Sequence, residues 1–153
     1  MNREIRIAAQ ASALLLAAFL ANCGVASAPT SVSWQAKLDA MPDAACVKGA
    51  IAATYAVSLA DYKHVEGPQT TDRYLIKVPP AVEPAMDITF SKAGNEPVGF
   101  TLAYGYSGRY EWANNTAAHA LIKAISSRCG VPELAERATR TTSGHWSADL
   151  GNV

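Results

Sequence analysis

The clearest pattern in the chain is a strict alternation of large apolar residues with small or polar ones over residues 98–105. Every second position holds Val, Phe, Leu or Tyr, and this period of two predicts a strand with one buried face. Shorter runs predict strands over residues 73–78 and 87–92. A further strand, favoured over continuation of a helix, is expected from Tyr55 to the turn signal Gly67-Pro68.

A helical period governs the second half of the chain. Apolar side chains at spacings of three and four form one continuous face, which predicts a helix whose first turn is capped by Asn114 or Asn115. Gly130 supplies a left-handed end to this helix, and Pro132 opens a further short helix. The face consists of Ala118, Leu121, Ile122, Ile125 and Cys129.

The N-terminal half contributes two more predicted helices. Pro42 and Asp43 suit the start of a helix that runs to about Ala53, because proline lacks only a hydrogen bond that this position does not make and the carboxylate faces the positive end of the dipole. Trp34 and Leu38 lie at helical spacing and indicate a short amphipathic helix.

These elements together predict an α+β fold, with a four-stranded antiparallel meander and helices before and after it packed on one face. We expect a single globular domain over residues 34–138. The Thr- and Ser-containing stretch after Ala138 predicts a loose C-terminal tail over residues 139–153.

The first residues have a different character. The run 7–21 is apolar apart from Gln10 and Ser12, and Arg3 and Arg6 precede it. It is shorter than the roughly 20 residues that span a bilayer, and its basic start is typical of a secretory signal peptide. We therefore expect residues 1–22 to be removed.

The border of this run, Leu20-Ala21-Asn22-Cys23, resembles the lipobox of bacterial lipoproteins, although Asn22 departs from the usual small residue. The resemblance covers residues 1–23 and implies that Cys23 carries lipid, with residues 23–33 as a flexible tether. By the same resemblance Gly24 implies the outer membrane of a Gram-negative cell, with the domain facing the periplasm. The alternative is cleavage after Ala28, giving a soluble periplasmic protein, but Pro29 disfavours it.

Export leaves two other cysteines, Cys46 and Cys129. If the helices that carry them cover the same face of the sheet, the two sulfur atoms can meet, and an oxidising compartment favours a disulfide. Two separate buried thiols are the alternative.

No catalytic or cofactor signature is visible. His64, His119 and His145 lie on separate segments without ligand spacing, so no metal site is predicted. The sequence Gly105-Tyr-Ser-Gly-Arg109 has an arginine where a nucleophile elbow needs glycine. Without residues 1–22, which hold two of the 13 basic and one of the 13 acidic residues, the chain has a charge of −1, and no nucleic-acid partner is expected.

One segment, residues 104–112, is rich in the residue types that dominate binding surfaces. We expect Tyr104 and Trp112 to close the core at the corner between strand and helix, and Tyr106, Arg109 and Tyr110, with Trp112 as a further candidate, to bind a partner. The sequence thus favours a membrane-anchored, non-enzymatic module for envelope assembly or protein binding. The alternatives are an inhibitor or immunity protein against a toxin or cell-wall hydrolase, and a small cell-wall hydrolase; a glycan ligand has no specific support.

Overall fold

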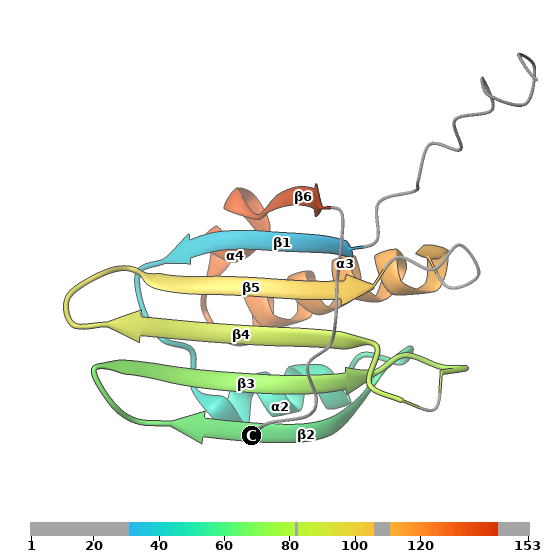
Figure 1. The fold of residues 1–153 in the computed structure, drawn as a ribbon, viewed down its shortest axis with the longest axis horizontal. Coiled ribbons are helices and arrows are strands. Elements are labelled where there is room, and N and C mark those ends of the chain that lie inside the picture. The colour runs from blue at the N-terminus through green and yellow to red at the C-terminus, as the bar shows by residue number, and fades with distance from the viewer. Residues whose placement is uncertain (1–30, 82, 106–110, 144–153) are drawn as a thin grey trace, which may run out of the picture.

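The computed structural model describes residues 31–81, 83–105 and 111–143, and these residues form an antiparallel sheet with helices on one of its faces (Figure 1). The predicted α+β class is confirmed, but the described residues contain six strands rather than four. The strand order in the sheet is β2-β3-β4-β5-β1-β6. The elements are β1 (Ser31–Leu38), α2 (Ala44–Ala52), β2 (Ser58–Val65), β3 (Gln69–Lys77), β4 (Met86–Ala93), β5 (Val98–Gly105), α3 (Glu111–Arg128), α4 (Pro132–Arg137) and β6 (Thr139–Ser143).

Strands β2 to β5 form the predicted meander, each paired antiparallel with the next. The range of β5 agrees with the alternation in the sequence. Strand β2 starts later than predicted, at Ser58, because Tyr55 lies in the preceding turn with its side chain fully exposed. A bulge interrupts β2 between Leu59 and Asp61.

The predicted short helix at Trp34 and Leu38 is wrong, because both residues belong to β1. Their spacing of four is even, so it also places them on one face of a strand. Strand β1 pairs with β5 along its full length, from Ser31 opposite Gly105 to Leu38 opposite Val98.

The other edge of β1 pairs with β6, from Ser31 opposite Ser143 to Gln35 opposite Thr139. Residues 31–33, expected in the tether, therefore start β1, and residues 139–143, expected in a loose tail, form a strand. Three threonines in this segment are β-branched and suit an edge strand, although no apolar alternation marks it.

Helix α2 has Asp43 as its N-cap, whose carboxylate accepts a hydrogen bond from the amide of Cys46 at 3.0 Å. Helix α3 begins before the predicted asparagine cap, because it already includes Glu111. Asn115 accepts a hydrogen bond from the hydroxyl of Tyr104 at 3.0 Å, and the amide of Asn114 donates to the carbonyl of Gly105 at 3.4 Å. Both asparagines thus attach α3 to the end of β5.

The core lies between the sheet and the three helices, which stand behind the sheet in Figure 1. Every second residue of β5 is buried, and Tyr104 is among these core residues as predicted. Leu121 and Ile125 of the predicted helical face are completely buried, and Leu134 of α4 is also buried. Gly130 has a φ of 65°, the left-handed conformation expected after α3.

The predicted disulfide between Cys46 and Cys129 is present, with the two Cα atoms 5.7 Å apart. It joins the first turn of α2 to the residue that follows α3, so it links the two helices that cover opposite halves of the sheet (Figure 1). Within the described residues, no helix is long and apolar enough to cross a bilayer.

Replacing both Cys46 and Cys129 with Ser is expected to lower the free energy of unfolding by about 4 to 5 kcal/mol, because the bridge closes a loop of 83 positions and restricts the unfolded chain. Urea unfolding of the variant and of the unreduced protein measures this loss. Intact mass after alkylation without reductant should show neither cysteine labelled, and labelling of both would contradict the bridge.

Candidate functional site

The face of the sheet opposite the helices is not covered by any described element (Figure 1). The side chains on this face alternate with the core positions, so they follow from the register of the strands. They are mainly hydroxyl, amide and charged groups. Examples across neighbouring strands are Gln35, Thr101, Thr89 and Arg73, which lie opposite one another in successive pairs.

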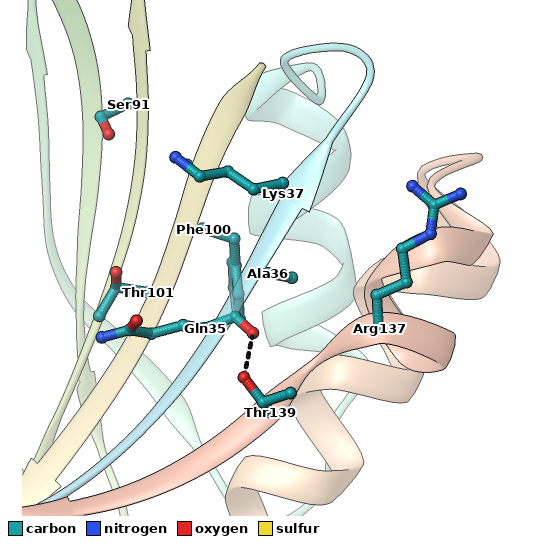
Figure 2. A pocket seen from close by; sticks show the side chains of 9 residues that line it. Gln35, Ala36, Lys37, Ser91, Phe100, Thr101, Arg137 and Thr139 are labelled. Atoms are coloured by element: carbon teal, nitrogen blue, oxygen red, sulfur yellow. Dashed lines mark hydrogen bonds between the residues drawn. The ribbon is translucent and has the colours of Figure 1, made fainter. Parts of the chain in front are cut away.

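A hollow of about 560 Å³ lies on β1 and β5, where α4 ends and β6 begins. It forms because β6 pairs with β1 only as far as Gln35, so the edge of β1 beyond that residue has no neighbouring strand among the described residues. The hydroxyl of Thr139 donates to the carbonyl of Gln35 at 3.4 Å and marks this last pair (Figure 2). We call this hollow on β1 and β5 the cationic hollow. Its polar lining residues are Gln35, Lys37, Ser91, Thr101, Arg137 and Thr139.

Gly99 lies close to the ammonium group of Lys37 within the hollow. The side chain of Lys37 extends over β5 toward Ser91 (Figure 2). A Cβ atom on Gly99 would lie 3.1 Å from the Oγ of Ser91 and 3.7 Å from the ammonium nitrogen of Lys37. The close contact would be with Ser91, whereas 3.7 Å is an ordinary van der Waals distance, so the ammonium group of Lys37 lies directly against the position that a side chain at residue 99 would occupy.

Arg137 is the second cation of the hollow and lies on the other side of β1 from the ammonium group of Lys37 (Figure 2). Neither cation has an ion-pair or hydrogen-bond partner among the described residues. No acidic residue lines the hollow. The arrangement therefore suits a negatively charged group or an extended acidic segment that lies across β1.

A second polar cluster lies at the opposite edge of the sheet, where β2 pairs with β3. The carboxylate of Asp72, whose residue is only 5% exposed, accepts hydrogen bonds from the Tyr62 hydroxyl at 2.8 Å and from the Nδ1 of His64 at 2.6 Å. The other ring nitrogen of His64 lies 3.4 Å from a carboxylate oxygen of Glu66. His64 thus bridges two carboxylates, and these hydrogen bonds, that with Asp72 foremost, raise its pKa above 6.5.

The rings beside this cluster connect it to the core. Tyr62 packs on Tyr74 with ring centroids 5.0 Å apart, and the ammonium group of Lys48 lies 3.7 Å from the Tyr62 ring centroid. Burial, followed by the hydrogen bond to Asp72, raises the pKa of Tyr62. This packing makes the cluster a means of holding the edge strand β2 against α2.

Sequence reasoning missed both features. His64 and Asp72 are eight residues apart and meet only because β2 and β3 pair at this register, a spacing that carries no motif. Lys37 and Arg137 are 100 positions apart and meet one hollow only through the pairing of β1 with β6. Gly99 was a signal for the hollow that the sequence offered, because an isolated glycine in a regular strand indicates that another group approaches the backbone closely.

The predicted binding residues have different positions. Tyr106, Arg109 and Tyr110 lie outside the described residues. Trp112 was expected to close the core, but its side chain is 81% exposed at the start of α3, so that interpretation is wrong. The exposure of its indole is compatible with a role of Trp112 in binding a partner, which stays a prediction.

His119 does not join the His64 cluster. The ring of His119 packs edge-to-face on Trp34, with centroids 4.7 Å apart, and His145 lies outside the described residues. No group of three metal-ligating side chains was found in the described part of the chain. Comparisons with family models, curated proteins and solved structures found no match, so the functional argument rests on the geometry.

The His64 cluster is expected to make the stability of the fold depend on pH. Because the folded pKa of His64 is raised above 6.5, the stabilisation is present below the unfolded pKa and is lost as pH rises through the folded value. Between about pH 6 and about pH 8, the wild-type protein should lose more free energy of unfolding than His64→Gln. Urea unfolding across this range measures it, and parallel profiles would contradict the assignment.

Proposed function

We propose that the protein is a lipid-anchored, periplasm-facing module of the outer membrane that acts without catalysis, by binding an acidic segment of an envelope protein at the cationic hollow. The carrying observation is the hollow itself, which holds Lys37 and Arg137 without partners among the described residues. Cations of this kind steer an acidic partner and set its orientation.

The position of the hollow supports a protein partner. Beyond Gln35 the edge of β1 is free of β6, so an extended segment has backbone groups to pair with over the last residues of the strand. The hydroxyl group of Thr139 lies at this edge, and the hydroxyl groups of Thr101 and Ser91 line the hollow on β5 and β4, where they offer hydrogen bonds to a polar chain.

The sequence and the disulfide together support the proposed location. The lipobox-like Cys23 supplies the anchor, and a bridge between Cys46 and Cys129 is typical of an oxidising compartment. A non-enzymatic role is favoured over a hydrolase because the pair formed by His64 and Asp72 lies at the β2 edge of the sheet, outside the hollow. The second ring nitrogen of His64 already faces Glu66. An inhibitor would use the same surface, with an acidic segment of the toxin or hydrolase as its target.

Metabolic labelling with a fatty-acid probe tests the anchor. The wild-type chain should incorporate the label and fractionate with outer membranes, whereas Cys23→Ser should carry no label, because the thiol that receives lipid is absent. An unlabelled wild-type protein in the soluble periplasmic fraction would instead indicate cleavage near Ala28. That result would remove the anchor from the proposal.

Binding of an acidic peptide tests the hollow. An oligoglutamate peptide should perturb the amide NMR signals of Lys37, Gly99 and Thr139. Replacing Lys37 and Arg137 with Gln should weaken its affinity about tenfold, since two exposed ion pairs at about 0.7 kcal/mol each correspond to that factor.

The matched control is Lys123→Gln with Arg128→Gln, which removes one exposed lysine and one exposed arginine from α3 on the helical side of the molecule. This variant should bind the peptide like the wild type. Equal loss of affinity in the control and in the double variant would mean that net charge, rather than the hollow, attracts the peptide.

A further inference from the structure

The two ends of the sheet can be distinguished from the strand register. Ser31 pairs with Gly105, Met86 pairs with Tyr104, and Ser58 pairs with Lys77. The starts of β1, β2 and β4 and the ends of β3 and β5 therefore lie together, on the right of Figure 1. We call this the tether end, because the segment between Cys23 and the domain joins β1 here.

The tether end carries the most exposed aromatic side chains of the described residues. Tyr55, in the turn before β2, is 105% exposed, and Trp112, in the first turn of α3, is 81% exposed. Pro79 and Pro80 are also exposed in the connection between β3 and β4. Large apolar rings left in water at one end of a domain indicate a contact surface.

The opposite end of the sheet is rich in exposed acidic residues. Four exposed carboxylates lie in the connections there: Asp39 and Asp43 between β1 and α2, Glu66 after β2, and Glu96 between β4 and β5. Anionic lipids repel such a surface, because bilayers that contain them carry a negative surface potential. Among the described residues, the connections of the tether end hold one exposed carboxylate, Glu83 between β3 and β4, so the exposed carboxylates are concentrated at the end opposite the exposed aromatic rings.

The length of chain between Cys23 and β1 limits the orientations that the domain can take relative to a membrane that holds Cys23. Cys23 precedes Ser31 by eight residues, which span at most about 28 Å when fully extended. The eight residues of β1 cover about 26 Å from the tether end to the opposite end. A tether of this length reaches little farther than the strand itself, so the opposite end could meet a membrane that holds Cys23 only with the tether almost fully extended along the domain, whereas the aromatic end can meet it without such extension.

We propose that the tether end rests on the lipid bilayer, with Trp112 and Tyr55 in the headgroup region; this orientation rests on the acylation of Cys23 proposed above. Trp and Tyr are the side chains that favour this region, because their rings are apolar and each keeps one hydrogen-bonding group. The strands then stand upright on the membrane, and the carboxylates of the opposite end point into the periplasm.

Quenching of tryptophan fluorescence by brominated lipids tests this orientation. The acylated full-length protein is placed in vesicles of phosphatidylethanolamine and phosphatidylglycerol that contain the quencher, and the signal of Trp112 is taken as the difference between wild type and Trp112→Phe. Brominated lipid should reduce this signal at least about twofold, because the indole lies at headgroup depth.

The matched control places the reporter at the other end of the sheet. In the Trp112→Phe background, Asn95→Trp adds an indole to the exposed turn between β4 and β5, and its signal should be unaffected by the quencher. Equal quenching of both reporters, or none of Trp112, would overturn the orientation.

Acylation has its own readout, so the two proposals fail separately. A protein that carries the fatty-acid label but shows no quenching of Trp112 is anchored without the orientation proposed here. A protein without the label fails at the anchor itself. In labelled protein, Tyr55→Ser with Trp112→Ser should speed amide exchange at Ala81 and Ala85 in vesicles, whereas Val65→Ser, at the opposite end of β2, should leave it unchanged.

Discussion

Strand β1 is the element on which the arrangement of the molecule depends. It lies between β5 and β6 and joins the first described segment to the last. Its inner face contributes Val32 and Leu38 to the core, while its outer face carries Lys37 across Gly99. Without β1, the core would be open beside β5, and α4 would lose the strand that it packs against.

Strand β1 also relates the two surfaces to which functions are assigned. Its first residue, Ser31, lies at the aromatic end, whereas Lys37 pairs with Gly99 near the opposite end. Six residues of strand separate them by about 20 Å. In the proposed upright orientation, the cationic hollow is therefore held away from the lipid headgroups, where a partner in the periplasm can reach it.

Much of the fold could be predicted because its central elements have strong periodicity. Strand β5 is buried on one face and open on the other, so its alternation is complete. Strand β6 pairs only with β1 and is rich in threonine, so it lacks the apolar alternation that identifies a strand. Trp34 and Leu38 misled because four residues is a repeat shared by helices and strands.

The candidate site could not be predicted for a related reason. Charged residues far apart in sequence, such as Lys37 and Arg137, reach one hollow only through strand pairing, which leaves no local pattern. The bridge between Cys46 and Cys129 could be predicted from the sequence, because a chain with few cysteines allows few possible pairings. Trp112 shows that residue type alone does not predict burial, since a tryptophan suits both a core and a binding surface.

The pairing of β1 with both β5 and β6 constrains the order in which the sheet can form. The N-terminal strand has no neighbour until residue 105 has been delivered, and it remains an edge until residues 139–143 arrive. The complete sheet therefore cannot form in the order in which the strands emerge, although β2 to β5 pair with their neighbours in sequence. If the chain is exported as proposed, almost the whole polypeptide must cross the membrane before the sheet can close.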